Sequence, residues 1–256
     1  MVDLVNELQG KVAVITGSAR NIGRATAEEL ARAGAALVIN AVQAKDLCEE
    51  VAAGIRARGG RAIPFVADVR DADAVKAMAA AAAKEFGGID IVVHNAAVRS
   101  NTPLEEMNFD TFRKSVEISI HGCFHLAKNM IPYMKNRGGG SFIGVGGLNS
   151  TRGAPGRAHT MAAKAGLAAF IRGLAYDFAP YGIRANQVVV GTYDTSRANN
   201  PSAAAQPLLR ALPDIPLGRK GVPQDMANLI RFLVGPGGDY ISGQTIHSNG
   251  GALMNM

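Results

Sequence analysis

Short apolar segments alternate with longer amphipathic segments along the chain. The short segments are apolar at consecutive positions, which is typical of strands buried on both faces of a parallel sheet. We expect strands at residues 12–16, 36–39, 61–66, 89–94, 141–145, 184–190 and 245–247. We expect helices at residues 22–33, 44–58, 72–86, 109–136, 157–178 and 224–233. This alternation predicts one α/β domain over residues 1–256, a doubly wound parallel seven-stranded sheet with helices on both faces and ligands at the carboxyl ends of its strands.

The connection between the first predicted strand and the first predicted helix has the composition of a phosphate-binding turn. Gly17 lets the chain turn off the strand, and free N–H groups near Ile22 and Gly23 form an anion site suited to a pyrophosphate. Gly23 also lets the helix pack close to the sheet. The pattern favours a dinucleotide ligand, and an ordinary tight turn is the alternative.

Composition and charge narrow the choice of function. With 256 residues, 48% of them apolar, the chain can bury one large core. Its two cysteines, Cys48 and Cys123, provide no disulfide framework, and no apolar run approaches a membrane span, so we expect a cytoplasmic protein with no membrane contact. The net charge is +6, but the basic residues are scattered singly and Trp is absent. This pattern argues against nucleic acid and favours a basic mouth for phosphate-bearing ligands.

Further motifs extend the pattern to the end of the chain. Thr16-Gly17, followed by Asn21-Ile22-Gly23, is similar to a TGxxxGIG loop, and His94-Asn95-Ala96-Ala97 is similar to NNAG. Arg184-Ala185-Asn186 and the segment 243–251 match the RxN and closing GQ…DGG motifs. The chain thus resembles the short-chain dehydrogenases/reductases of the FabG-like type over essentially its whole length. The resemblance implies a Rossmann-like fold and a nicotinamide nucleotide held by Gly17, Arg20, Asn21, Ile22, Gly23, Asp68, Val69, Asn95 and Lys164.

The end of the second predicted strand bears on the choice of nucleotide. A carboxylate there would bind the adenosine ribose and repel a 2′-phosphate, but the chain has Asn40 and no acid. Arg20 lies where NADP-preferring members of the family carry a basic residue. We therefore expect NADP rather than NAD, with a solvated loop cation as the alternative for Arg20. Asn21 replaces a glycine near the pyrophosphate, which leaves weak or lost nucleotide binding open.

The residues that the family uses for catalysis are largely replaced. In the family, a tyrosine donates the proton, a lysine four residues later lowers its pKa, a serine contacts the substrate oxygen and an asparagine supports the lysine. Here Lys164 is retained, either holding the nicotinamide ribose or solvated, whereas Thr160, Gly147 and Ser119 take the other three positions. A threonine hydroxyl is a far weaker acid than a phenol, and glycine has no hydroxyl. We expect no ordinary dehydrogenase turnover by this chain alone.

Two other sets of residues could supply chemistry. Tyr193, just past the sixth predicted strand, and His159, beside the vacated tyrosine position, are candidate surrogate acids. His121 and His125 have a spacing that can bind zinc, but no third ligand is nearby. We expect these two histidines to pack in a subunit interface, and we expect no metal.

Two hypotheses of function follow. The first is a catalytically degenerate subunit that pairs, in a tetramer, with an intact active paralogue. The chain is similar in this respect to the non-catalytic subunits of heteromeric hydroxyacyl-CoA dehydrogenases, such as that of the benzylsuccinate/toluene pathway. The second is an atypical NADP-dependent oxidoreductase that acts on a carbonyl or alcohol with a surrogate acid. Arg152, Arg157, Arg197 and Arg210 near the predicted mouth suit an anionic or CoA-linked substrate in either case. A nucleotide-sensing regulator is not separable from the first hypothesis by sequence.

Overall fold

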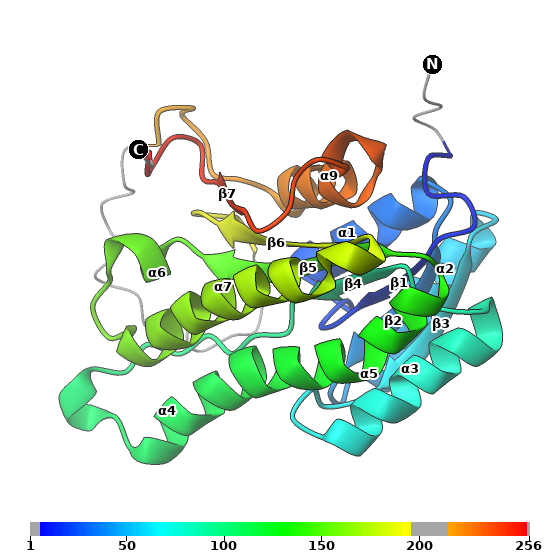
Figure 1. Ribbon diagram of the computed structural model, residues 1–256. Coiled ribbons are helices and arrows are strands. Elements are labelled where there is room, and N and C mark those ends of the chain that lie inside the picture. Colours follow the sequence, from blue (N-terminus) through cyan, green and yellow to red (C-terminus); the bar gives the residue numbers. More distant parts are fainter. Residues whose placement is uncertain (1–5, 196–214, 255–256) are drawn as a thin grey trace.

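The computed structural model describes residues 6–195 and 215–254, and its strands form one parallel sheet (Figure 1). The strand order is β3-β2-β1-β4-β5-β6-β7, so the direction of winding reverses between β1 and β4. The strands are β1 (Val12–Ile15), β2 (Ala36–Ala41), β3 (Arg61–Val66), β4 (Ile91–His94), β5 (Gly140–Gly147), β6 (Ile183–Val190) and β7 (Thr245–Ser248). The predicted doubly wound, seven-stranded parallel sheet is confirmed.

Helices cover both faces of this sheet. One face packs against α1 (Asn21–Arg32), α2 (Lys45–Ala57) and α9 (Pro223–Val234). The other packs against α3 (Ala72–Phe86), α5 (Gly122–Asn136) and α7 (Ala158–Phe178). The shorter helices are η1 (Leu104–Glu106), α4 (Phe109–Val116), η2 (Glu117–His121), α6 (Asn149–Arg152), η3 (Ala179–Tyr181) and η5 (Pro236–Gly238). No helix in the described part of the chain combines the length and apolar character needed to cross a bilayer.

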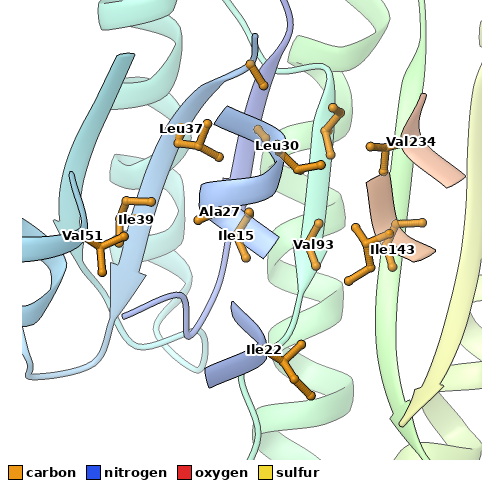
Figure 2. Close-up of a cluster of buried hydrophobic side chains, with 14 of the residues drawn as sticks. Ile15, Ile22, Ala27, Leu30, Leu37, Ile39, Val51, Val93, Ile143 and Val234 are labelled. Atoms are coloured by element: carbon orange, nitrogen blue, oxygen red, sulfur yellow. The ribbon is translucent and has the colours of Figure 1, made fainter. Parts of the chain in front are cut away.

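Successive residues of the buried strands face opposite helical layers. Ala13 and Ile15 of β1 belong to the cluster with α1, α2 and α9, whereas Val14 belongs to the cluster with α3, α5 and α7. Figure 2 shows the first cluster, in which Leu30 of α1 is drawn with Ile15 and other strand residues. Because both faces are covered, the strands are apolar at consecutive positions, as the sequence pattern indicated.

The long helix predicted at residues 109–136 is interrupted, which corrects that prediction. The five-residue π-helical turn η2 separates α4 from α5. Within this turn the carbonyl oxygen of Ser119 accepts a hydrogen bond from Nε2 of His94 at 3.2 Å. A side chain that occupies a helix carbonyl in this way is a recognised cause of a break in the regular ladder. The break therefore depends on a contact between two segments that are distant in sequence.

Strand β5 continues two residues past its predicted end at Val145. The sequence is rich in glycine there, which favours an end to the strand. In the structure a Cβ at Gly144 would lie 3.1 Å from Ile171 of α7, and one at Gly146 would lie 2.9 Å from Gln187 of β6. The glycines thus allow α7 and β6 to approach β5 closely, and they bring the end of β5 to the functional site.

Candidate functional site

A cleft of about 660 Å³ opens at the carboxyl ends of β1, β4, β5 and β6. It is lined by the glycine loop after β1, the segment after β4, the end of β5 with α6, the first turns of α7 and the segment after β6. The cleft therefore lies at the edge of the sheet where ligands bind in doubly wound folds. The structure brings together there Gly17, Arg20, Asn21, Ile22, Gly23, Asn95, Gly147, Thr160, Lys164 and Tyr193.

The glycine loop is held in place by contacts that leave no room for larger residues. A Cβ at Gly23 would lie 2.3 Å from the carbonyl oxygen of Gly17, and Gly17 itself has a φ of 63°. Asn95 fixes the loop from β4, because its Nδ2 donates to the carbonyl oxygens of Thr16 and Gly17 at 3.0 Å each. The N-terminus of α1 consequently points its free N–H groups into the cleft, as an anion site requires.

Asn21, predicted to replace a glycine of the family's loop, has a backbone conformation that glycine adopts easily. Its φ is 49°, and it is the one non-glycine residue of the described chain with a positive φ. Asparagine is among the residues that adopt this left-handed region at modest cost, whereas alanine is not. The exchange thus preserves the path of the loop while its side chain enters the lining of the cleft.

This backbone conformation gives a first testable prediction. Asn21→Gly is expected to raise the free energy of unfolding by about 0.5 kcal/mol, because glycine has no Cβ to crowd the carbonyl at positive φ. Asn21→Ala is expected to lower it by about 1 kcal/mol, because alanine keeps the Cβ but lacks the polar side chain that lets asparagine adopt this conformation. Urea denaturation of the three proteins provides the measurement. Equal stabilities of the glycine and alanine variants would contradict it.

Arg20 lines the cleft, whereas Asn40 is buried beside the glycine loop and does not line the cleft. Arg20 immediately precedes α1, is exposed, lines the cleft and forms no ion pair with a described carboxylate. The Asn40 amide is used structurally, since its Oδ1 accepts from the N–H of Gly17 at 3.3 Å and its Nδ2 donates to the carbonyl of Ala67 at 3.0 Å. No carboxylate therefore stands at the end of β2 to repel a 2′-phosphate.

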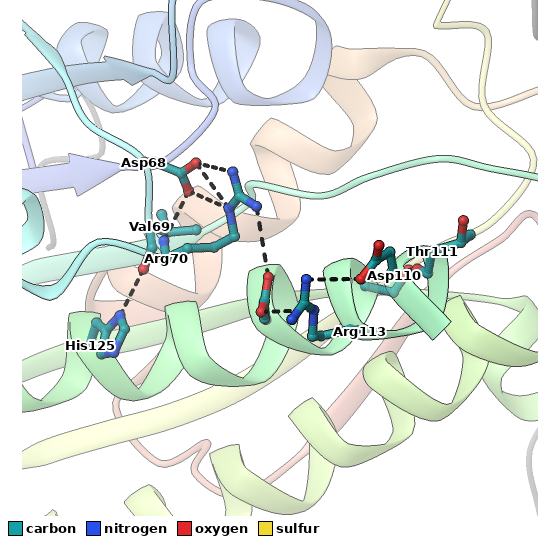
Figure 3. Close-up of polar contacts among 9 residues, drawn as sticks. Asp68, Val69, Arg70, Asp110, Thr111, Arg113 and His125 are labelled. Atoms are coloured by element: carbon teal, nitrogen blue, oxygen red, sulfur yellow. Dashed lines mark hydrogen bonds and ion pairs between the residues drawn. The ribbon is translucent and has the colours of Figure 1, made fainter. Parts of the chain in front are cut away.

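Asp68 and Val69 are not among the residues that line the cleft. Figure 3 shows the Asp68 carboxylate paired with Arg70, whose Nη2 donates to it at 2.6 Å. The guanidinium lowers the pKa of Asp68 below its usual value against the opposing effect of burial. Val69 is buried, and its carbonyl oxygen contacts Nδ1 of His125 at 3.0 Å. Contact of Asp68 and Val69 with adenine stays a prediction.

Lys164 lies at the floor of the cleft, on the second turn of α7. Its Nζ donates to the carbonyl oxygen of Val145 on β5 at 2.6 Å. Burial lowers the pKa of Lys164 to about 8, with the neighbouring Cys123 opposing and Arg99 reinforcing the change. Burial also raises the pKa of the Cys123 thiol to about 12, so this thiol stays neutral. Lys164, predicted to match the family's catalytic lysine, thus has an amine that gains and loses its proton near neutral pH.

The two positions that should carry hydroxyl groups for catalysis face the cleft without a suitable acid. Thr160 Oγ1 donates to the carbonyl oxygen of Arg157 at 3.0 Å, so its proton is directed at the backbone of its own helix. No heavy atom lies within 4 Å of a Cβ built on Gly147. Open space therefore exists where the family's serine would stand, and no phenol reaches the cleft from α7.

Ser119, predicted to take the position of the family's asparagine, is buried in the π turn and does not line the cleft. The sequence pattern gave no role to His94, which receives one here. Burial, helped by the charge of Lys164, lowers the pKa of His94 to about 3, so the imidazole is neutral. Its Nε2–H donates to the Ser119 carbonyl, and its Nδ1 lies 3.4 Å from Thr16 Oγ1. His94 thereby joins the π turn to the strand that carries the glycine loop.

The two candidate surrogate acids have different positions. Tyr193 lines the cleft, and its hydroxyl hydrogen-bonds with Ser248 Oγ at 2.6 Å. Burial raises the pKa of Tyr193, although the bond to Ser248 works against this. His159 is fully buried, bonds through Nε2 to Ser100 Oγ at 2.6 Å and does not line the cleft. The structure thus corrects the expectation that His159 could serve as the acid, and it leaves Tyr193.

Of the other residues predicted for substrate or metal binding, some line the cleft and some do not. Arg152 and Arg157 line the cleft, whereas Arg197 and Arg210 lie outside the described residues. His121 belongs to the π turn, so it does not share a regular helical face with His125. Within the described residues, no group of three or more His, Cys, Asp or Glu side chains is arranged to hold a metal ion.

Comparisons with known proteins agree with this geometry. A family model described as enoyl-(acyl carrier protein) reductase matches residues 17–252. The chain is 35% identical to the 3-oxoacyl-[acyl-carrier-protein] reductase of Synechocystis over 248 residues, which is 96% of this chain and 98% of that protein. A solved short-chain dehydrogenase/reductase from Brucella melitensis superposes with a TM-score of 0.87 at 30% identity, covering 97% of this chain and 99% of its own. A dehydrogenase/reductase from Sinorhizobium meliloti gives 0.88 at 34% identity and 98% of both chains.

Proposed function

The chain belongs to the short-chain dehydrogenase/reductase family, and from this premise we propose that it is a catalytically degenerate subunit that supports an NAD(P)-dependent dehydrogenase. One observation carries the proposal. The cleft keeps its glycine loop and Lys164, whereas Thr160 is bonded to its own helix and Gly147 has no side chain. A chain built in this way holds the nucleotide but lacks the proton donor and the donor to the substrate oxygen.

The residues of the cleft fit a nicotinamide dinucleotide. Because Gly23 packs closely against Gly17, the N-terminus of α1 has no side chain at this position. Its backbone N–H groups would hold a pyrophosphate there. Arg20 would hold a 2′-phosphate, and Lys164 would hold the nicotinamide ribose. When bound, the nucleotide supplies or accepts the hydride. The chain's own groups orient it, but no phenol stands beside Lys164 to deliver a proton to the substrate oxygen.

An apolar groove on the surface supports assembly with another subunit. It lies between α5 and α7, has a volume of about 640 Å³ and is lined by Phe124, Ile131, Phe170, Leu174 and Phe178 among others. An exposed apolar surface of this kind is typical of a subunit contact. We place an intact paralogue there, in a tetramer. That partner would carry the serine, tyrosine and lysine and oxidise a 3-hydroxyacyl-CoA to a 3-oxoacyl-CoA.

A second candidate function is an atypical NADP-dependent oxidoreductase. It is favoured by Tyr193, the one tyrosine that lines the cleft. In this case Tyr193 donates the proton in place of the missing phenol. The bond of its hydroxyl to Ser248 and its raised pKa make it a slow donor, so this candidate predicts a low rate of turnover.

Nucleotide titration by calorimetry separates these candidates. The purified chain is titrated with NADPH and NADH, alone and after co-expression with a paralogue that has the full set of catalytic residues. Micromolar binding without turnover by the chain alone, and turnover by the complex, support the degenerate subunit. Turnover by the chain alone that is lost in Tyr193→Phe would support the second candidate instead.

Arg20 provides a prediction on nucleotide choice. Arg20→Gln is expected to weaken NADPH binding about 10- to 100-fold and to leave NADH binding unchanged, because a hydrogen bond between charged groups contributes about 1.5–3 kcal/mol. Arg24→Gln is the matched control, since Arg24 lies in α1, four residues after Arg20, but pairs with Glu28 and Glu50 and does not line the cleft. Equal losses of affinity for NADPH and NADH in Arg20→Gln would show that Arg20 does not bind the 2′-phosphate.

A further inference from the structure

The charge of the cleft is one-sided. Among the described residues that line it, no aspartate or glutamate occurs. The cationic residues of the lining are Arg20, Arg99, Arg152, Arg157, Lys164 and Lys220. A concave site with charges of one sign concentrates ligands of the opposite sign. The cleft therefore favours ligands that carry negative charge.

Arg157 differs from the other partly buried arginines of the described chain. Arg231, which is also partly buried, pairs with Glu7 and Glu29, and Arg184 donates to the carbonyl oxygen of Leu233. The guanidinium groups of Arg152 and Arg157, by contrast, form no ion pair and no hydrogen bond with any described residue. Arg152 is exposed at the rim of the cleft, whereas Arg157 is half-buried. Arg157 thus holds five N–H donors partly withdrawn from water with no acceptor supplied by the described protein.

The burial of Arg157 is unfavourable unless a ligand supplies an acceptor. Burial lowers the pKa of Arg157, which reflects the loss of water around its charge. A charged donor removed from water without a partner costs free energy, whereas a carboxylate or phosphate in the same place forms strong paired hydrogen bonds. An anionic oxygen group beside Arg157 would remove this cost.

The position of Arg157 separates it from the nucleotide phosphates. The glycine loop follows β1, whereas Arg157 lies between β5 and α7. In the sheet, β4 lies between β1 and β5. The carbonyl oxygen of Arg157 accepts the Thr160 hydroxyl, so the arginine is one helical turn from the position where the family's acid would meet the substrate. Arg99 stands on the facing segment after β4, where it bonds to Thr195 Oγ1 at 2.9 Å. Arg157 thus belongs to the substrate end of the cleft.

We propose that the substrate end of the cleft, at Arg157 with Arg152 at its rim, is a binding site for the carboxylate of a short oxo- or hydroxy-acid. The inference rests on the proposed function, since it takes the glycine loop as the nucleotide end. Arg157 and Thr160 lie three residues apart at the start of α7 and both line the cleft, so a short molecule at this end of the cleft can contact both residues. A phosphate of a carrier thioester has the same anionic oxygens but lies far from its carbonyl, so it is the competing source.

Binding without nucleotide tests the site directly. Acetoacetate and its neutral ethyl ester are titrated into the wild-type chain, Arg157→Gln and Arg172→Gln, with calorimetry as the readout. Arg172 is an exposed arginine of α7 outside the cleft, so it controls for loss of one positive charge. We expect wild type and Arg172→Gln to bind acetoacetate with the same affinity, and Arg157→Gln to bind it about 10- to 100-fold more weakly. The affinity for the neutral ester should be the same in all three proteins. Equal binding of acetoacetate by wild type and Arg157→Gln would overturn the proposal.

Two further titrations identify the source of the anion and separate this proposal from the function. Acetoacetyl-CoA carries its charge on distant phosphates. If Arg157→Gln loses affinity for this thioester but not for acetoacetate, the carboxylate assignment is overturned. If it loses affinity for acetoacetate but not for the thioester, the assignment is supported. NADPH titration of the same variants completes the test. If wild type binds acetoacetate but not NADPH, the proposed function fails while the carboxylate site stands. If Arg157→Gln weakens NADPH as much as acetoacetate, the arginine serves the nucleotide, and the proposal is overturned.

Discussion

Combined replacement of Thr160 by tyrosine and Gly147 by serine is expected to raise NADPH-dependent reductase activity about 10³-fold over the wild-type chain. A positioned acid typically contributes about 10²–10⁴ in rate and a donor to the substrate oxygen about 10²–10³. The two act on one transition state, so their effects do not simply multiply. The structure has space for both groups, since Thr160 lines the cleft and nothing lies within 4 Å of a Cβ on Gly147. Lys164 stands one helical turn from residue 160, where its charge favours a phenolate.

The control for this variant has the same shape without the hydroxyl groups. Thr160→Phe combined with Gly147→Ala fills the same space but supplies neither acid nor donor, so its activity should stay at the wild-type level. The assay follows NADPH oxidation with acetoacetate and acetoacetyl-CoA as substrates. If the tyrosine and serine variant folds, binds NADPH and still equals this control, the cleft does not bring a carbonyl within reach of residue 160.

The pH dependence of the restored activity follows from Lys164. Burial lowers the pKa of this lysine to about 8. Below that pH the ammonium is charged and lowers the pKa of a neighbouring phenol, whereas above it the charge and the benefit are lost. We expect the activity of the tyrosine and serine variant to decline above about pH 8. A profile that stays level from neutral pH to about pH 9.5 would show that Lys164 does not act on the new phenol.

Elements with strong local signals were predicted to the residue. The bounds of β3 and α3 are those expected from sequence. For α3 the reason is visible at both ends, since the Asp71 carboxylate accepts from the N–H groups of Asp73 and Ala74 and Gly87 ends the helix with a φ of 87°. The π turn at Ser119 had no such signal, because it depends on His94 from another strand. Local chemistry thus predicts where elements begin and end, and tertiary contacts decide where they are interrupted.

The same division applies to the functional site. Thr160 and Lys164 are four residues apart, so the helical period alone places both on the cleft side of α7. His159 is adjacent to Thr160 in sequence, but one residue along a helix turns the side chain by about 100°. Its ring therefore faces Ser100 in the interior instead of the cleft. Asp68 is paired with Arg70, two residues further on, a contact that the adenine-site motif does not encode.

The glycine loop depends on a buried ion-pair network at the other end of α1. Glu29 is 3% exposed and accepts hydrogen bonds from Arg231 Nη1 and Gln224 Nε2 of α9, at 2.7 Å each, and from Arg32. Burial alone would raise the pKa of Glu29, but the hydrogen bonds from Arg231 and Gln224 and the charge of Arg32 outweigh it and lower the pKa. The carboxylate thus stays ionised and fixes α1 against α9, and with α1 the anion site at its N-terminus.

Arg231→Leu is expected to lower the free energy of unfolding at neutral pH by about 3–5 kcal/mol, because it removes the guanidinium that pairs with the buried carboxylates of Glu7 and Glu29 and leaves Glu29 with Gln224 and the exposed Arg32. In wild type the lowered pKa of Glu29 contributes stability that is present above the carboxyl's ordinary pKa and is lost as the pH falls. In the variant, burial raises that pKa, the carboxyl takes up a proton, and the deficit should shrink at about pH 4. Arg24→Leu, on the same helix as Glu29, removes exposed ion pairs and should change the free energy of unfolding by about 1 kcal/mol or less. Urea denaturation at both pH values measures all three proteins, and a deficit in Arg231→Leu that does not change with pH would mean that Glu29 is not the group left unpaired.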